Sequence, residues 1–347
     1  MPASSILSAA LLTIGCTSTG DTGGADDTAT TSPPTECTPC DGDRQVRTAA
    51  DLESVRWCSE IDGSLDITLG DDSLTDLDPL SCLTAVSGDL HIRRNDALAS
   101  VRGLGALRSV GGSLWLADDD VLQGPLGMDS LETVGGSVMI GRNPLLESVD
   151  GLSGLVRIGR NLKVTENPVL QSLDGLESLS EIGQDLVVED NPALVGIDAL
   201  ADVTALDLVI IEGNERLADL GGLASLVEVG RLYVRTNGSL ATLDGLGALR
   251  TVRRDMEIAD NDGLLTLDGL QGPLTVGNDL FVMDHALLAD VEALRSVESV
   301  GRLLWVVGND SLCQDDAVAA VADIAMDKVA NVSDNFGPCD DSGDTRR

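Results

Sequence analysis

Residues 156–179 read VRIGRNLKVTENPVLQSLDGLESL, and this stretch decides the fold because its neighbours repeat it. The 24 residues before it read ETVGGSVMIGRNPLLESVDGLSGL, and the 24 after it read SEIGQDLVVEDNPALVGIDALADV. The three blocks match in the positions of their apolar residues, glycines and asparagines. A fixed period of this length is typical of a solenoid, in which each repeat is one structural unit stacked on the last.

Each repeat contains a short segment in which apolar residues alternate with other residues. Its first inward position recurs eleven times at intervals of 23 to 25 residues, as Leu65, Leu90, Leu114, Val138, Leu162, Leu186, Val209, Leu232, Met256, Leu280 and Leu304. The position two residues later is also aliphatic every time, as Ile67, Ile92, Leu116, Ile140, Val164, Val188, Ile211, Val234, Ile258, Val282 and Val306. This alternation predicts one β-strand per repeat with one buried face.

After each strand the apolar spacing changes from two to three. Leu170, Leu173, Leu176 and Leu179 follow one another at this interval. Such spacing does not fit a helix of useful length, and it predicts a coil that turns corners and returns. One turn cannot bury its own apolar face, so the turns on either side must supply the core. We therefore predict a β solenoid, parallel β-helix-like, of about eleven 24-residue rungs over residues 65–312, roughly 50 Å long.

An asparagine follows the first inward strand residue by five positions in most repeats. The set is Asn95, Asn143, Asn167, Asn191, Asn214, Asn237, Asn261 and Asn309, and Asp119 and His285 occupy the same position in two other repeats. An inward asparagine at a corner bonds to the backbone of the adjacent turn, satisfying groups that regular structure leaves free. We expect a structural ladder from these residues.

The outward strand position, one residue after the first inward one, carries most of the aromatic residues. Aromatics are only 2% of the chain, yet two of its three Trp residues, its one Tyr and one of its two Phe residues occupy this position. Outward strand positions that face water are normally polar, so this stripe predicts a contact surface for a protein or a glycan. The candidate binding residues are Trp115, Met139, Val187, Ile210, Tyr233, Phe281 and Trp305. The alternative interpretation is that the stripe only favours strand formation, or is covered by a loop.

The repeat also resembles a known family. Its Leu-x-Ile-x-x-Asn-x-x-Leu spacing is shared with leucine-rich repeats, and the triplet leucines, the Ile-Gly before each strand and the terminal cysteines resemble the receptor L domain over about residues 50–340. The resemblance implies a right-handed β-helix-like solenoid. L domains occur in ligand-binding ectodomains of growth-factor receptors and in bacterial and fungal surface proteins. This chain has more rungs than the receptor version, so receptor ligands are not carried over.

Six cysteines lie at the two ends of the repeat region. Cys37, Cys40, Cys58 and Cys82 precede most of it, within or near an N-terminal cap over residues 37–64, and Cys313 and Cys339 belong to a C-terminal cap and tail over residues 313–347. An even number at the ends of a solenoid predicts disulfides formed in an oxidising compartment. We expect Cys313 to pair with Cys339, and Cys58 to pair with Cys40 or Cys82. Apolar residues at helical spacing predict a capping helix over residues 314–329.

The N-terminus predicts export. Residues 6–14 form an apolar run too short to span a bilayer, followed by Gly15 and Cys16. Residues 13–16 resemble a bacterial lipobox, although Thr13 stands where leucine is usual, and an ordinary secretory signal is the alternative. We expect a signal peptide over residues 1–16 with Cys16 acylated, then a disordered linker over residues 17–36. By this resemblance Thr17 favours the bacterial outer membrane or cell surface, and the protein is otherwise secreted.

The charge and the scarcity of histidine restrict the possible functions. A net charge of −36 repels nucleic acid and anionic lipid heads, so we expect no nucleic-acid partner and membrane attachment only through the lipid. His91 and His285 lie eight rungs apart, which leaves no Ser-His-Asp or Cys-His arrangement. The strongest catalytic alternative is a β-helix polysaccharide lyase or hydrolase, in which Asp118, Asp119 and Asp120 hold Ca²⁺ or act as acid and base, and a solvated acidic turn is the other interpretation. We expect no catalytic residue, cofactor or metal, and a structural or adhesive envelope protein is a second alternative.

Overall fold

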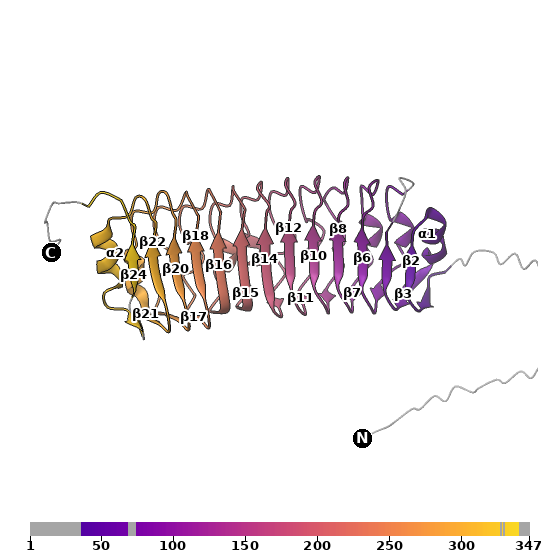
Figure 1. Ribbon diagram of the computed structural model, residues 1–347. Coiled ribbons are helices and arrows are strands. Elements are labelled where there is room, and N and C mark those ends of the chain that lie inside the picture. The colour runs from indigo at the N-terminus through magenta and orange to yellow at the C-terminus, as the bar shows by residue number, and fades with distance from the viewer. Residues whose placement is uncertain (1–35, 69–73, 327, 329, 340–347) are drawn as a thin grey trace, which may run out of the picture. The chain divides into compact units, whose positions relative to one another are not determined.

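The computed structural model describes residues 36–68, 74–326, 328 and 330–339. In the larger, C-terminal unit of the chain, parallel strands lie side by side along one axis, with α1 (Ala49–Val55) near one end and α2 (Gln314–Val321) near the other (Figure 1). Mostly parallel strands in two sheets form a solenoid-like coil, which confirms the general architecture expected from the repeat. The predicted signal segment with Cys16, and the linker up to residue 35, lie outside the described residues.

One sheet, here called the front sheet, contains the strands that were expected from the period-two alternation. Each strand pairs in parallel with the next and without a register shift. The order is β2 (Arg44–Val46), β4 (Leu65–Ile67), β6 (Leu90–Arg93), β8 (Leu114–Ala117), β10 (Val138–Gly141), β12 (Leu162–Thr165), β14 (Asp185–Glu189), β15 (Ala205–Glu212), β16 (Glu228–Arg235), β18 (Met256–Ala259), β20 (Leu280–Met283), β22 (Leu304–Val307) and β24 (Asn331–Ser333).

The other sheet, the back sheet, consists of mostly shorter strands that precede the front strands in each turn. These are β1 (Thr38–Asp41), β3 (Cys58–Asp62), β5 (Ala85–Val86), β7 (Ser109–Val110), β9 (Thr133–Val134), β11 (Arg157–Ile158), β13 (Glu181–Ile182), β17 (Thr251–Val252), β19 (Leu274–Val276), β21 (Val297–Val300) and β23 (Ala325–Met326). The eight-residue strands β15 and β16 pair with each other along their length, and β16 pairs with β17 of the back sheet as well as with β18 of the front sheet, so the two sheets share hydrogen bonding from there on. The arrangement is a coil and not a closed barrel, because β2 and β24 do not pair with each other within the described residues.

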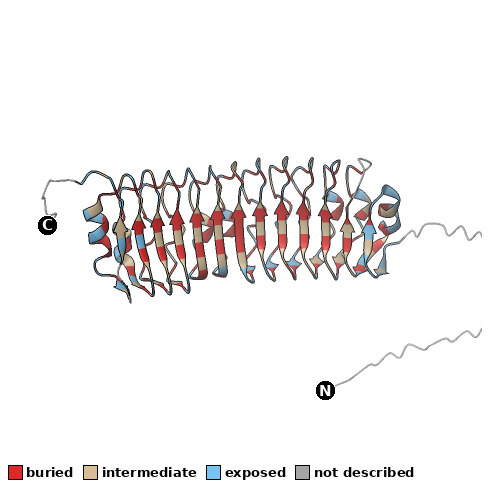
Figure 2. Cartoon of the chain, in the orientation of Figure 1, coloured by how far each residue is buried: buried red, intermediate tan, exposed pale blue. Residues whose placement is uncertain are grey.

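The core is a stack of aliphatic side chains enclosed by every turn. Leu162 and Val164 from β12, and Leu170 and Leu176 from the return path, are all 0% exposed. Burying one such side chain contributes about 1.5–3 kcal/mol relative to leaving it in water. Figure 2 shows buried and half-buried residues alternating along the front strands. Short 3-10 helices bend some return paths: η1 (Asp78–Leu80), η2 (Arg102–Leu104), η3 (Asp198–Leu200), η4 (Gly221–Leu223) and η5 (Glu292–Ser296).

The corner between the two sheets is glycine in most turns because successive turns approach closely there. A Cβ atom built on Gly135 would lie 2.2 Å from the carbonyl oxygen of Gly111 in the preceding turn. Real Cβ atoms do not approach a carbonyl oxygen so closely, so a larger residue requires a local shift of the two turns, as at the equivalent positions of Ser87, Asp207 and Arg253.

The strand pairing extends beyond the predicted solenoid at both ends. In the N-terminal region assigned to a cap, β1 already pairs with β3 and β2 with β4. The predicted helix over residues 314–329 was too long, because α2 ends at Val321. The chain then forms β23 and β24, which pair with β21 and β22. Open strand edges leave backbone groups unpaired, so these last strands satisfy hydrogen bonds that a longer helix would have left free.

Within the described residues, two disulfides lie near the N-terminal end of the coil and one near its C-terminal end. They join Cys37 to Cys82, Cys40 to Cys58, and Cys313 to Cys339. The Cys313–Cys339 pairing was expected, and Cys58 takes the first of its two expected partners. Among the described residues, no helix has the length and apolar character needed to cross a membrane.

Candidate binding surface on the front sheet

The outward stripe of the sequence forms one continuous column across the front sheet. Each member is the register partner of the next, so neighbouring side chains are separated by one strand spacing of about 4.8 Å. The outward column runs in order through Asp66, His91, Trp115, Met139, Lys163, Val187, Ile210, Tyr233, Glu257, Phe281 and Trp305. All seven candidate binding residues therefore lie on one sheet face, one to a strand.

The first aromatic group lies on β6 and β8. The rings of His91 and Trp115 are 4.9 Å apart between centroids and tilted by 43°. The guanidinium of Arg93 lies 6.0 Å from the Trp115 ring, and it also pairs with Asp66 at 3.2 Å. Because Arg93 is held by Asp66, the Trp115 ring is supported on one side by a fixed cation. Met139 follows Trp115 in the column and extends this apolar area.

The second group, here called the central platform, consists of Val187, Leu208, Ile210 and Tyr233 on β14, β15 and β16. Ile210 and Tyr233 are half-buried neighbours in the column, and Leu208 lies beside them on β15. Val187 is only 6% exposed, so it supports the platform more than it offers contact area. Its neighbours in the column, Lys163 and Ile210, are longer side chains one strand spacing away on either side and shield it.

Arg235 fixes the tyrosine of the central platform. Its guanidinium lies 4.4 Å from the Tyr233 ring centroid and pairs with Glu257 at 2.8 Å and with Glu212 at 3.7 Å. Burial against this surface raises the pKa of the Tyr233 hydroxyl, and nearby Asp255 raises it further. The ring is therefore neutral at physiological pH and presents a fixed aromatic surface.

The third group lies on β20 and β22. The rings of Phe281 and Trp305 are 5.4 Å apart and tilted by 58°. Trp305 is 38% exposed. Met283 and Val307 lie two residues further along the same strands and are half-buried, so this end of the sheet presents four neighbouring apolar side chains.

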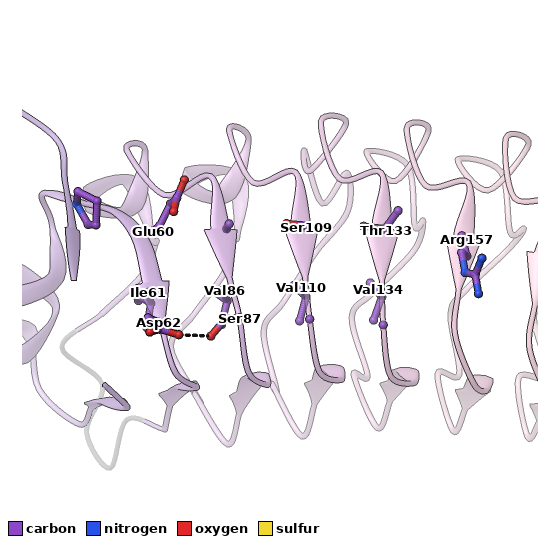
Figure 3. A pocket seen from close by; sticks show the side chains of 14 residues that line it. Glu60, Ile61, Asp62, Val86, Ser87, Ser109, Val110, Thr133, Val134 and Arg157 are labelled. Carbon is purple, nitrogen blue, oxygen red and sulfur yellow. Dashed lines mark hydrogen bonds between the residues drawn. The ribbon is translucent and has the colours of Figure 1, made fainter. Parts of the chain in front are cut away.

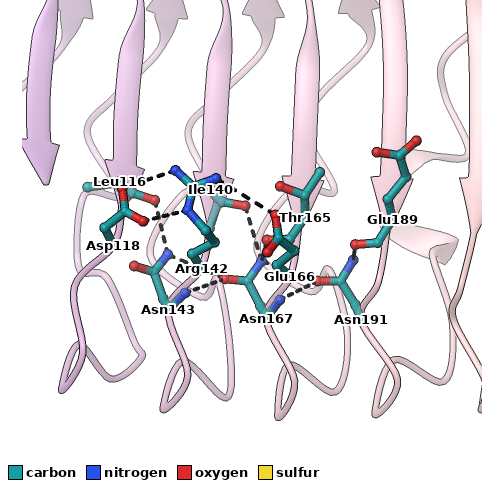
Figure 4. Close-up of polar contacts among 10 residues, drawn as sticks. All are labelled: Leu116, Asp118, Ile140, Arg142, Asn143, Thr165, Glu166, Asn167, Glu189 and Asn191. Carbon is teal, nitrogen blue, oxygen red and sulfur yellow. Dashed lines mark hydrogen bonds and ion pairs between the residues drawn. The ribbon is translucent and has the colours of Figure 1, made fainter. Parts of the chain in front are cut away.

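Below the column, the asparagines of the expected ladder are completely buried. Asn167 shows the pattern: its Nδ2 donates to the Ile140 carbonyl at 3.1 Å and to Oδ1 of Asn191 at 3.2 Å (Figure 4). Its own Oδ1 accepts from the backbone N–H and the Nδ2 of Asn143. Asn335, which lies beyond the predicted solenoid, continues the series by accepting from Asn309. These bonds keep the ends of adjacent front strands in register.

The residue before each ladder position was not singled out by the sequence. Nine of these described residues have positive φ without being glycine: Arg94, Asp118, Arg142, Glu166, Asp190, Thr236, Asp260, Asp284 and Asp334. A left-handed residue costs roughly 1 kcal/mol or more, so the buried ladder bonds that follow it must offset that cost. Five of the nine are Asp, and positive-φ glycines, Gly213 and Gly308, stand at the same position in two other turns, so the position does carry a signal: Asp and Gly enter the left-handed region more readily than most residues.

The three aspartates of the catalytic alternative have separate environments. Asp118 accepts hydrogen bonds from the Arg142 guanidinium, and this contact lowers the pKa of Asp118. Asp120 is exposed. Asp119 is 0% exposed and stands in the ladder, so the interpretation of all three as a solvated turn was wrong for this residue. Burial raises the pKa of Asp119 to about 7, against the effect of the Asn95 hydrogen bonds. Among the described residues, no three His, Cys, Asp or Glu side chains are grouped so as to hold a metal ion.

A shallow groove on the back sheet was not found from the sequence. It has a volume of about 750 Å³ and crosses β3, β5, β7, β9 and β11 (Figure 3). Small residues at equivalent positions, such as Ala85, Ser109 and Thr133, leave it open. Its polar contacts include a 3.0 Å bond that Ser87 donates to Asp62. No aromatic side chain lines it, so the front sheet is the stronger candidate for binding.

No protein-family model matches the chain, and a search of curated proteins found no match to its sequence.

Proposed function

We propose that this protein is a non-enzymatic, lipid-anchored surface protein that binds a protein or a glycan through its front sheet. The finer architecture belongs to the same proposal: a right-handed coil of the receptor L-domain type with about eleven 24-residue rungs. The observation that carries the proposal is the outward column, in which a chain with only 2% aromatic residues places four of its six Trp, Tyr and Phe rings on one sheet face.

The extent of the column suits a large partner. Trp115 and Trp305 lie on strands eight positions apart in the front sheet, which corresponds to about 38 Å. Three apolar groups are spread over this length, separated by the charged residues Lys163 and Glu257. Aromatic residues set among polar ones are typical of contact surfaces, because a ring contributes a large contact area at a small cost in conformational entropy. A flat row of rings also suits stacking on sugars.

The non-enzymatic part of the proposal is supported by the state of the histidines. His285 is buried in the ladder, where its Nδ1 accepts from the Asn261 N–H at 3.1 Å and its Nε2 lies 3.2 Å from the Ile258 carbonyl. Both ring nitrogens are thus occupied by the backbone. His91 stacks on Trp115 in the outward column, far along the coil from His285. Neither histidine has a nucleophile as a hydrogen-bond partner within the described part of the chain.

The lipid anchor is proposed from the lipobox-like segment at Cys16, with the outer membrane or cell surface as the location. Growth of the producing bacterium with a labelled fatty acid tests it, because acylated protein retains the label after lipid extraction. A Cys16→Ser variant that carries the same label as wild type would contradict this part of the proposal.

The binding proposal is tested with a Trp115→Ala/Tyr233→Ala variant and a matched control. The control is Trp57→Ala/Phe336→Ala, because Trp57 also lies near an arginine, at 5.2 Å from Arg56, and Phe336 is 72% exposed, but neither belongs to the outward column. Both variants and wild type are applied to glycan arrays and to surface-protein panels after their circular dichroism spectra have been matched.

Loss of a ligand in the column variant but not in the control supports the binding function. Equal binding by all three proteins refutes the assignment to the front sheet. If wild type binds nothing, a structural or adhesive role in the envelope replaces the proposal. Turnover of an acidic polysaccharide that is lost in Asp119→Asn would instead establish the enzymatic alternative.

A further inference from the structure

The central platform differs from the other two apolar groups in its charged surroundings. Asp185 and Glu189 lie on β14 at either side of Val187, and Glu212 lies on β15 beside Glu189 in register. The outward residues therefore place carboxylates at both ends of a row whose centre is apolar. In a chain of net charge −36, this part of the front sheet is acidic around a hydrophobic centre.

These carboxylates are incompletely neutralised by the protein itself. Burial raises the pKa of Asp185, and the like charge of Asp207 raises it further. Burial also raises the pKa of Glu189, with added repulsion from Glu212 and Asp190. The nearby cations, Lys163 and Arg254 for Asp185 and Lys163 and Arg235 for Glu189, oppose these shifts without cancelling them.

A groove of about 490 Å³ continues the platform beyond the ends of its strands. It is lined by Glu166, Pro168, Asp190, Pro192, Gly213 and Glu215. Asp190 and Gly213 directly follow Glu189 and Glu212, so the groove begins where β14 and β15 end. Figure 4 shows Glu166 and Glu189 at the ends of neighbouring strands.

The charges in this groove are only partly paired. Glu166 lies 3.7 Å from Arg142. Asp190 and Glu215 are exposed and form no ion pair with any described residue. Two proline rings beside unpaired carboxylates form a site for a long side chain with an apolar stem and a cationic head, as in lysine or arginine.

We propose that the central platform and this groove bind a cationic, extended polypeptide segment whose sheet-facing residues, every second one along the chain, are in turn apolar and basic. An apolar side chain of the segment packs on Ile210 and Tyr233. Residues two apart in an extended chain face the same side and are about 6.8 Å apart, so the next sheet-facing residue, which is basic, lies over Glu189 and Glu212, and its stem follows the groove past the prolines. The inference rests on the proposed function, because it names the partner of the same surface. Acidic glycans and other polyanions are disfavoured by the same carboxylates.

The test uses the full chain and three synthetic octapeptides of the form Val-Ser-X-Ser repeated twice, in which X is lysine, glutamine or glutamate, so that valine and X share one face of the extended peptide. A Glu189→Gln/Asp190→Asn/Glu215→Gln variant removes three charges from the site. The matched control, Glu60→Gln/Asp62→Asn/Glu298→Gln, removes three exposed charges from β3 and β21 of the back sheet, so the change in net charge is the same. Affinity is measured by fluorescence anisotropy at low and high salt, together with binding of a neutral oligosaccharide.

The expected result is that wild type binds the lysine peptide best, with affinity falling by at least ~10-fold in the site variant and by less than ~2-fold in the control. High salt should weaken the wild-type complex. Equal affinity for the lysine and glutamate peptides, or equal loss in the site variant and the control, overturns the inference. If the neutral oligosaccharide binds wild type and the site variant equally but not Trp115→Ala/Tyr233→Ala, the binding function stands and the cationic partner does not.

Discussion

Replacing Asp119 by asparagine should stabilise the protein at neutral and alkaline pH. In the other turns the ladder asparagine uses Oδ1 as an acceptor and Nδ2 as a donor, as Asn143 does toward the Leu116 carbonyl at 3.0 Å. Asp119 keeps the acceptor, since its Oδ1 receives the N–H and the Nδ2 of Asn95. Its other oxygen, Oδ2, is buried without a hydrogen-bond partner within the described residues. An ionised carboxylate cannot supply the missing donor, whereas a protonated one or an asparagine can.

The magnitude follows from the raised pKa. The ordinary value is 3.8 and the value in the folded protein is about 7, so below pH 3.8 both states hold the proton and no penalty arises. As the pH rises from 3.8 to about 7, the unfolded chain releases its proton first, and the free energy of unfolding falls. A difference of roughly 3 pKa units corresponds to about 4 kcal/mol, all of which is present above pH 7.

Urea unfolding followed by circular dichroism, at several values between about pH 4 and about pH 8.5, measures this difference. Asp119→Asn should exceed wild type by about 4 kcal/mol at the alkaline end and by little at the acidic end. Asp118→Asn is the matched control, because Asp118 is ion-paired and its pKa is lowered, so this variant should gain nothing. Parallel stability curves for Asp119→Asn and wild type, or a less stable variant at pH 8, would refute the reasoning.

Three further predictions concern the same framework. Burial lowers the pKa of His285 from 6.5 to about 4, so the stability that the neutral ring contributes above pH 6.5 is lost as the pH falls toward 4. His285→Asn should therefore be more stable than wild type by up to about 3 kcal/mol near pH 4 in the same urea assay. At about pH 8 it should show no such gain. Asn191→Ala removes the donor to the Val164 carbonyl at 2.9 Å and should lower the free energy of unfolding by roughly 2–4 kcal/mol in the same urea assay. A loss under about 0.5 kcal/mol would mean that the ladder bonds contribute little. Removing the Cys313–Cys339 disulfide by replacing both cysteines with serine should lower the free energy of unfolding by about 2–4 kcal/mol. Hydrogen exchange should show the loss of protection concentrated in β22 and β24. A uniform loss along the coil would show that this end does not unfold independently.

Much of the fold was predictable because the same order of apolar, polar and glycine positions recurs in repeat after repeat. Leu162 and Val164 were assigned inward by alternation alone, and both are completely buried. The ends were not predictable in the same way. The residues of β1, β2, β23 and β24 lack the full repeat pattern, and they became strands because the neighbouring strands left backbone groups to pair.

Of the candidate site, only the outward residue of each strand was predicted from the sequence. Reading one outward residue per strand led to Ile210 and Tyr233 and to the rings around them. The same alternation, read two residues further along each strand, would have added Glu189, Glu212 and Arg235. That Val187 is almost covered, and that Arg235 lies against Tyr233, depend on side-chain lengths across neighbouring strands, which a single-strand pattern does not contain.

The sequence by itself determined the period, the strands, the buried faces and the outward column, because these depend on the order of residues within one turn. The tertiary structure decided which of the front cysteines pair, the protonation of Asp119, and the gathering of Glu166, Asp190 and Glu215 around one groove. Each of these involves groups about one turn apart or more, whose distances are set by how the turns stack. That stacking is a property of the whole coil, since each turn buries its apolar face only against the next.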